Sequence, residues 1–545
     1  MIVHRKQWPR AALWLIPAVF FSVFFVYPTA HLIVVALQGE SGWQLGAFWA
    51  ALTDAGMLSV AWFTIWQAAV STLLTLLVAL PGAWVLAKYQ FRGRGLVEAL
   101  SVVAFVMPSV VVATAVSVTL APDGPLGWLL PEDANRGLGA IFFAHIYFNV
   151  AVVLRVVSTY WRQLDPQQEQ AAATLGANPL QVFTSVTLRR LWPAILASGA
   201  IVYLFTFTSF GIILLLGKYS QATIEVEIQR QVLFLFDLPV AAALSVVQIV
   251  FVVLLLWWQA RLSDRLTSQQ DLAVTDSLPR PTTGRSRIVV AAFLLGATAL
   301  FAGPVLLVIQ RAFTTGSNYG LQNFAALNES RRGSTLFVSP VIAVGNSLMF
   351  ALMATILAVL IGGMVAWSLS TRPGSARESL WLLPLGVSAV TLGFGMLISF
   401  DSAPLNLRGT PFLVPIAQAL VAIPFVIRAL LPVLRSIRGE LREAAATLGA
   451  TPWQIVRFVD WPIASRALWV AVGFSFAISL GEFGATLFVA PTNNPTVPIA
   501  IYRFLGTPGE TNQGQAMALA SILIVMTAAV VLVTNRFRTP GGRYV

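Results

Sequence analysis

Long apolar runs alternate with short polar segments along the whole chain, and within each run the apolar residues are continuous instead of occupying every second position. A helix of about 20 such residues, rising about 1.5 Å per residue, crosses the roughly 30 Å hydrocarbon core of a bilayer. In lipid every backbone polar group needs an internal partner, so only helices and closed barrels span it. Because continuous runs favour helices, the pattern predicts an all-α polytopic membrane protein.

The polar breaks divide the chain into two halves with six predicted spans each. We expect a first transmembrane half at 1–260, a polar cytoplasmic linker at 261–287 and a second transmembrane half at 288–545. The first run follows basic residues, as in a secretory signal peptide, but it is longer and lacks a convincing cleavage site, so we expect an uncleaved span. The predicted spans lie near 11–37, 58–88, 98–120, 138–158, 196–216, 239–260, 288–310, 345–370, 379–400, 411–433, 468–490 and 515–535.

An internal repeat relates the two halves. Residues 170–189 read QAAATLGANPLQVFTSVTLR, and residues 443–462 read EAAATLGATPWQIVRFVDWP. A single offset of 273 positions aligns this motif and its surroundings, and it pairs Gly176 with Gly449. The match continues without a gap well beyond the motif, which indicates an internal duplication.

Each copy of the motif predicts two short helices joined by a glycine corner. Gly176 and Gly449 follow the alanines and suit the left-handed position at which many helices end. The next helix begins at once, with Asn178 or Thr451 as N-cap and a proline after it. A simple connector would have the same local structure, but duplication of an identical corner favours an element that docks on a partner.

Composition and charge placement agree with a membrane protein. Of the residues 57% are hydrophobic and 10% are charged, whereas soluble domains carry about 25% charged residues. A net charge of +12 would suit nucleic acid, but the arginines and lysines gather in alternate loops, so we expect no nucleic-acid partner. That bias places both termini, the linker and both glycine corners in the cytoplasm. The repeat is therefore expected to be parallel, with its pseudo-twofold axis along the membrane normal.

No catalytic or metal site is predicted. The sequence has no phosphate-binding loop of the form G-x-x-x-x-G-K-[ST], and it has no cysteine for a metal or a disulfide. Its three histidines, His4, His31 and His145, are scattered. We therefore expect ATP chemistry, where it is needed, to reside in another chain.

Two like halves around an axis would enclose a cavity on that axis, and the sequence offers few groups to line it. Glu482 is the acidic residue that lies well inside a predicted span, and Ser209 is its repeat mate. A carboxylate in the membrane is costly and usually faces a cavity or a partner. The candidate pathway residues are Thr206, Thr208, Ser209 and Glu482; the alternative is a solvated helix break near the outer surface.

The glycine-corner motif resembles the EAA signature of permease subunits in type I binding-protein-dependent ABC importers. The second copy continues through Val459 and Trp461-Pro462 as in that family, and the resemblance covers both halves. The first copy departs from the family pattern, because Gln170 stands at the glutamate position and Arg189 at the proline position. The residues at the signature positions are Gln170, Ala171, Ala172 and Gly176 in the first copy, and Glu443, Ala444, Ala445 and Gly449 in the second.

The resemblance implies the type I importer fold, with about 12 helices as two parallel six-helix repeats. It implies that these residues form two coupling helices, each seated on one of two copies of a cytoplasmic ATPase subunit that binds ATP and Mg²⁺, while this chain binds no cofactor. It also implies delivery of substrate by an extracytoplasmic binding protein and a place in the cytoplasmic membrane of a bacterium.

Two substrate classes remain open from the sequence, together with a second kind of transporter. Fused halves of this size resemble thiamine and ferric-iron permeases, and the segments 144–149 and 221–225 resemble the thiamine permease more closely. An ion- or proton-coupled secondary transporter is a further alternative, which would need a relay of buried ionisable residues.

Overall fold

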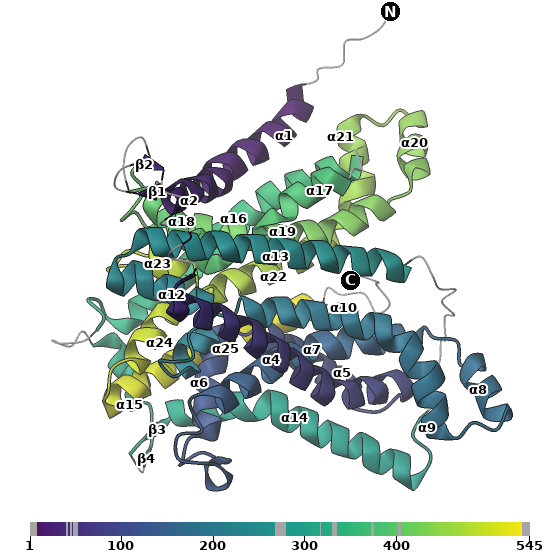
Figure 1. The fold of residues 1–545 in the computed structure, drawn as a ribbon. Helices are drawn as coiled ribbons and strands as arrows, with labels where there is room; N and C mark the ends of the chain where they lie inside the picture. Colours follow the sequence, from purple (N-terminus) through teal and green to yellow (C-terminus); the bar gives the residue numbers. More distant parts are fainter. Residues whose placement is uncertain are drawn as a thin grey trace, which may run out of the picture.

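The computed structural model describes residues 8–39, 42–43, 46, 49, 53–267, 280–316, 318–329, 335–371, 375–401 and 405–536. Within these ranges the chain is almost wholly helical, and its strands are two pairs of two residues each. The long helices run broadly side by side between two ends of the molecule (Figure 1). The predicted all-α membrane fold is confirmed.

The first half consists of these elements: α1 (Trp8–Phe21), the π-helical turn η1 (Ser22–Val26), α2 (Tyr27–Leu37), β1 (Gln38–Gly39), β2 (Gly42–Trp43), α4 (Ala55–Lys88), α5 (Arg94–Val106), α6 (Ser109–Leu120), η2 (Gly127–Leu129), α7 (Leu138–Arg162), α8 (Gln167–Thr174), α9 (Pro179–Val182), η3 (Phe183–Thr187), α10 (Leu188–Phe207), α11 (Gly211–Leu216), α12 (Ile224–Arg230), η4 (Gln231–Leu235) and α13 (Leu238–Thr267).

The second half repeats that order: α14 (Gly284–Ala312), β3 (Thr314–Thr315), β4 (Asn318–Tyr319), α15 (Gln322–Ala325), η5 (Ala326–Asn328), α16 (Pro340–Thr371), α17 (Ser375–Leu382), η6 (Leu383–Gly386), α18 (Ala389–Ser399), α19 (Leu413–Ser436), α20 (Gly439–Thr447), α21 (Pro452–Ile455), η7 (Val456–Asp460), α22 (Trp461–Gly481), α23 (Thr486–Val489), α24 (Val497–Leu505) and α25 (Glu510–Arg536). Even the small antiparallel hairpin recurs, as β1–β2 and β3–β4.

Ten of the described helices are long and apolar enough to cross a membrane, and the count becomes twelve if each of two bent pairs is one span. The bent pairs are α5 with α6, at 110°, and the helix from Leu380 to Gly386 with α18, at 102°. They occupy the predicted spans 98–120 and 379–400. The apolar segments therefore lie where we predicted them, but each is a bent pair of helices and not the single straight span that we expected.

Two further predicted spans were shifted along the chain. The structure has continuous helical segments at Pro179–Phe207 and Trp453–Gly481, where we expected spans at 196–216 and 468–490. Each helix begins directly after the corner glycine and ends about nine residues before the predicted end of its span. The chain then folds back through short helices. Helices also cover both ends of the expected linker, since α13 reaches Thr267 and α14 starts at Gly284; residues 268–279 lie outside the described residues.

The first helix of each half packs on the opposite half. In the first half α1 contacts α16, and α2 contacts α18 as well as α13. In the second half α14 contacts α5 and α6 as well as α25. This reciprocal exchange ties the two halves into one body.

Short helices fill the middle of the molecule. The helix α11 packs on α6 and α23 packs on α18, while α12 contacts α18 and α24 contacts α6. At their centre the repeat mates Phe210 and Phe483 stack on each other, with ring centroids 5.4 Å apart. Repeat mates can meet in this way only close to the pseudo-twofold axis, so aromatic rings occupy the midline at this level.

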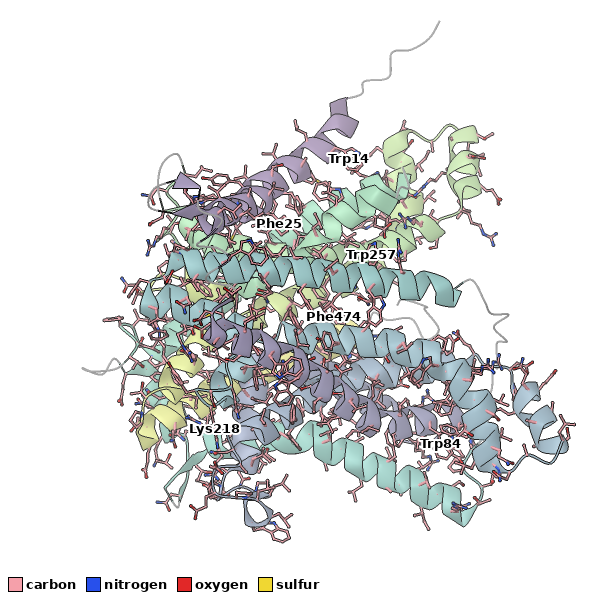
Figure 2. The ribbon with its side chains drawn as sticks, viewed as in Figure 1. Trp14, Phe25, Trp84, Lys218, Trp257 and Phe474 are labelled. Carbon is pink, nitrogen blue, oxygen red and sulfur yellow. The ribbon has the colours of Figure 1, made fainter. Side chains whose placement is uncertain are left out.

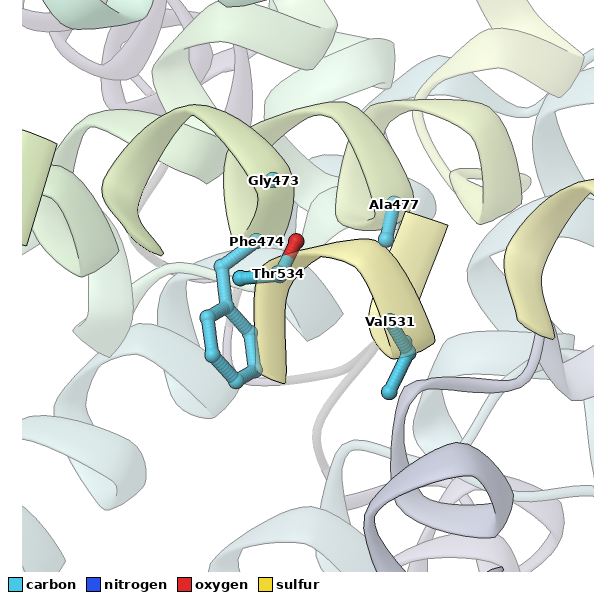
Figure 3. Close-up of a pocket in the computed structure, with 5 residues that line it drawn as sticks. All are labelled: Gly473, Phe474, Ala477, Val531 and Thr534. Carbon is cyan, nitrogen blue, oxygen red and sulfur yellow. The ribbon is translucent and has the colours of Figure 1, made fainter. Parts of the chain in front are cut away.

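A small pocket lies away from that axis, between α22 and α25 (Figure 3). Its volume of about 10 Å³ is room for about one water molecule. It is lined by Gly473, Phe474, Ala477, Val531 and Thr534. A side chain at Gly473 would collide with Thr534, so the glycine lets the two helices approach closely, and the pocket is a packing gap and no substrate site.

We predict that the two glycine corners face the same aqueous compartment. Leu175 and Leu448 are each 89% exposed and Trp128, in η2, is 78% exposed, and the chain has no native cysteine. With a membrane-impermeant maleimide, Leu175→Cys and Leu448→Cys should label only in inside-out vesicles, and Trp128→Cys only in right-side-out vesicles. Labelling of the two corners from opposite sides would contradict a parallel repeat.

Candidate functional site

The two predicted helix–glycine–helix corners are present and nearly identical. Gly176 has a φ of +89° and Gly449 a φ of +85°. In the first copy the N–H of Gly176 donates to the carbonyl of Ala173 at 3.0 Å, and that of Ala177 donates to Ala172 at 3.1 Å. The equivalent bonds recur around Gly449, at 3.0 Å each. This is the pattern that terminates a helix at a left-handed residue, so the predicted left-handed conformation of both glycines is confirmed.

The helix after each corner starts with reciprocal capping bonds. Asn178 Oδ1 accepts from the Gln181 N–H, and Gln181 Oε1 accepts from the Asn178 N–H, both at 2.9 Å. In the second copy Thr451 and Gln454 make the same exchange, at 2.7 and 3.4 Å. The caps fix the angle between the two short helices from both sides of the glycine.

Apolar side chains point outward at both corners. Leu175 and Leu448 are followed by other exposed apolar residues, among which Leu180 is 71% and Trp453 68% exposed. In Figure 1 α8 and α20 project together from the same end of the molecule. Exposed apolar surface rimmed by polar groups marks a protein contact. Of the signature residues Ala172 and Ala445 are half-buried, and the exposed ones are Gln170, Ala171, Gly176, Glu443, Ala444 and Gly449.

A polar brace ties each first short helix to the long helix that follows, and its charge is inverted between the halves. In the first half Glu169 accepts from Lys88 Nζ and from Thr187 Oγ1, at 2.9 Å each. The offset of 273 pairs Glu169 with Arg442 and Thr187 with Asp460. Arg442 Nε donates to Asp460 Oδ1 at 2.7 Å, and the Asp460 side chain is buried. In the first half the short helix therefore carries the acceptor, Glu169, and in the second half it carries the donor, Arg442.

The four candidate pathway residues all lie at the breaks after α10 and α22, where each is bonded within the protein. Thr206 and Thr208 donate to carbonyls one turn earlier in α10. Ser209 bonds His145 Nε2 at 2.9 Å. Glu482 accepts from the N–H of Ala485 at 2.7 Å and of Thr486 at 2.9 Å.

These bonds bear on the two interpretations of Glu482, as a residue of the substrate pathway or as a solvated group at a helix break near the outer surface. Its carboxylate is buried, with 6% of the residue exposed, so it is no solvated group at the outer surface. It satisfies the free N–H groups that start α23, as a capping residue does. Its predicted place in the pathway stays a prediction.

Sequence reasoning missed other buried carboxylates. Glu225 and Glu227 are 1% and 3% exposed, although they lie between the predicted spans 196–216 and 239–260. The Arg230 guanidinium pairs with Glu227 at 3.0 Å. The signal was the pattern of acidic residues among apolar ones in the segment TIEVEIQR, which is unusual for an exposed loop. Among the described residues no group of His, Cys, Asp and Glu could hold a metal ion.

Comparison with known proteins finds similarity to membrane subunits of importers. Residues 79–268 match the model of the binding-protein-dependent transport system inner membrane component family. The thiamine transport system permease protein ThiP of Salmonella typhimurium is 26% identical, with 96% of each chain covered. Proteins of the same name from Escherichia coli and Brucella abortus are each 27% identical, covering 95% and 93% of this chain and 96% and 92% of their own. The chain is thus similar to binding-protein-dependent permeases, in residues 79–268 by the family model and along nearly its whole length by these relatives.

The match covers the two-half architecture as well as the motif. The family model matches from within α4 through the whole of α13, and the structural repeat carries the same elements through the second half. The relatives align along nearly their whole length, so they share the fused form. The resemblance expected from the EAA signature is therefore confirmed at the level of the permease family and the type I membrane fold.

The inverted brace gives a testable prediction about the second corner. Arg442→Glu should loosen α20 by about 1–3 kcal/mol, because it places a second carboxylate beside the buried Asp460 while the Arg442 site keeps contact with solvent. Adding Asp460→Thr restores the glutamate–threonine pair of the first half and should recover most of that loss. Hydrogen–deuterium exchange over residues 439–460 measures both. Equal exchange in the single and double variants would show that the brace does not hold the helix.

Proposed function

We propose that this chain is the membrane subunit through which an ATP-driven importer moves thiamine, or a thiamine phosphate, into the bacterial cytoplasm. The observation that carries the proposal is the pair of equivalent, exposed helix–glycine–helix corners at one end of a permease whose halves form one body. The substrate is supported by the relatives, which are named thiamine transport system permease proteins along nearly the whole chain.

Two like corners suit two like partners. Each coupling helix, α8 or α20, would sit in a groove of one ATPase copy, with Leu175 or Leu448 as the apolar anchor. ATP and Mg²⁺ would be bound by those partners, because this chain has no phosphate-binding loop. The coupling residues are Gln170, Ala171, Ala172, Gly176, Glu443, Ala444, Ala445 and Gly449. Because Gln170 is neutral where Glu443 is charged, the two contacts need not be equal.

The end opposite the corners would receive the binding protein. Figure 2 shows Lys218 at that end, and its ammonium pairs with Asp133 at 2.5 Å. This hydrogen bond lowers the pKa of the Asp133 carboxyl, which keeps the exposed carboxylate charged at neutral pH. Arg311 makes a similar ion pair with Asp123. Charged loops here suit recognition by a water-soluble partner, and the basic loops at the other end support a cytoplasmic location for both termini.

Transport would follow alternating access. Closure of the ATPase dimer moves α8 and α20, and the braces pass that motion to the long helices α10 and α22. The halves then part around the axis where Phe210 meets Phe483, accept the substrate from outside and release it inward. Thr206, Thr208, Ser209 and Glu482 would line or support this path.

Two alternatives are kept for the test. A ferric-iron importer permease would share the corners and the fold. An ion-coupled secondary transporter would need a chain of ionisable groups through the membrane, and it gives the exposed corners no role.

Thiamine uptake tests the substrate. Cells that depend on external thiamine should lose uptake of radiolabelled thiamine when this gene is deleted, and should regain it from a plasmid copy. The purified chain alone should hydrolyse no ATP. Unchanged thiamine uptake together with reduced ferric-iron uptake would replace the proposed substrate by iron.

The corner glycines test the coupling. No heavy atom lies within 4 Å of a Cβ added at Gly449, so a side chain there meets no steric clash. The cost of a substitution is then the strain of the positive φ, about 1 kcal/mol for alanine and more for valine. Gly449→Val should insert and express normally but should lose stimulation of the ATPase by the loaded binding protein, and Gly176→Val should act in the same direction.

Gly439→Val is the matched control, because Gly439 also has open space around it but has an ordinary φ. It should leave coupling intact. Normal coupled transport by the double variant Gly176→Val with Gly449→Val would show that the corners are connectors only.

A further inference from the structure

A polar cluster centred on Glu225 joins the two halves. Its carboxylate accepts a hydrogen bond from Ser388 Oγ at 3.0 Å and a short one from Gln248 Nε2. Thr391 Oγ1 in turn donates to Gln248 Oε1 at 3.3 Å. Glu225 lies on α12 and Gln248 on α13 in the first half, whereas Ser388 and Thr391 begin α18 in the second half. The cluster therefore spans the contact between the halves.

The cluster lies deep within the predicted bilayer. Gln248 is ten positions after the first residue of α13, which places it about 15 Å along that helix at 1.5 Å per residue. That is about half of the roughly 30 Å apolar thickness. Transporters commonly place their substrate sites at this depth, at the interface of their repeats and beside interrupted helices, and both α12 and α18 follow such interruptions.

Glu225 differs from the other buried carboxylates of the region because it neither pairs with a cation nor caps a helix among the described residues. Glu227, on the same helix, is paired with Arg230, and Glu482 caps α23. Among the described residues no lysine, arginine or histidine pairs with Glu225, whose partners are neutral. A carboxylate is costly at this depth, so its retention calls for an explanation beyond packing.

The duplication supplies an internal control. The offset of 273 pairs Glu225 with Pro498, and the N-cap that corresponds to Ser388 is Pro108, before α6. The fold thus builds the same contact, between α24 and α6, with apolar residues at both positions. A buried carboxylate is therefore not required by the architecture, and it stands on one side of the axis alone.

We propose that Glu225, with Gln248 beside it, binds the positively charged group of a transported organic cation while the halves are apart. In the closed arrangement Ser388 fills one side of the carboxylate. Separation of α12 from α18 removes Ser388, and the cation takes its place, so the site exists only in the state that accepts substrate. This inference rests on the proposed function, because the thiazolium ring of thiamine carries the required charge.

The test uses proteoliposomes that contain the full chain, its ATPase and its binding protein. Glu225→Gln keeps the shape but removes the charge; its amide oxygen can accept from Gln248 while its NH2 group donates to the Ser388 hydroxyl. Glu227→Gln is the matched loss of a buried carboxylate from the same helix. Uptake is measured for radiolabelled thiamine and for its uncharged analogue with a thiophene ring. Glu225→Gln should lower thiamine uptake about tenfold or more, with little change for the analogue, while Glu227→Gln should affect both equally.

The outcomes separate the inference from the function on which it rests. Full thiamine uptake by Glu225→Gln would overturn the site and leave the proposed function standing. An equal loss for both compounds, with a lower Tm, would show that Glu225 has a structural role and would also overturn the site. If the wild-type complex takes up neither compound although its ATPase is stimulated, the proposed substrate itself is wrong.

Discussion

Interrupted helices inside a bilayer need protein around them, because a free N–H or carbonyl in lipid has no partner. Each half of this chain carries such breaks, and the bonds that satisfy them repeat across the duplication. The N–H of Ile224, which starts α12, donates to Thr64 Oγ1 at 3.0 Å, and that of Val497, its repeat mate, donates to Ser347 Oγ at 2.8 Å. The breaks come together around the pseudo-twofold axis, and α1, α2 and α14 reach across to cover them. The need to enclose interrupted backbone thus explains why the halves form one body.

The same architecture separates rigid parts from parts that can move. Each of the two exposed short helices, α8 and α20, is held by a glycine corner, reciprocal caps and a polar brace, so force applied at its exposed face would pass to the long helix behind it. The contacts at the axis are of another kind: stacked rings, hydrogen bonds from neutral side chains such as Ser388 and short helices. When the two halves move apart, contacts of this kind can break and re-form without separating an ion pair inside the lipid. The arrangement favours motion between the halves over motion within them.

The sequence predicted what depends on local pattern. The apolar runs gave the fold class, the 273-residue offset gave the duplication, and the glycines and caps gave both corners, since each is decided within a few residues. The interruptions at Pro108 and Ser388 were missed because hydropathy continues through a bend. Glu225 was missed because its partner Ser388 is 163 positions away. The brace was missed because its two copies share no residue type: Glu169 with Thr187 became Arg442 with Asp460.

The central claim is that one chain presents two docking sites to two ATPase copies. Native mass spectrometry of the complex, purified through a tag on this chain, measures it directly. The account predicts a principal species with one copy of this chain and two copies of the ATPase, and a loss of one ATPase when either corner is altered. A chain that purifies alone from cells expressing the ATPase, or that binds a single copy through one corner, would contradict it.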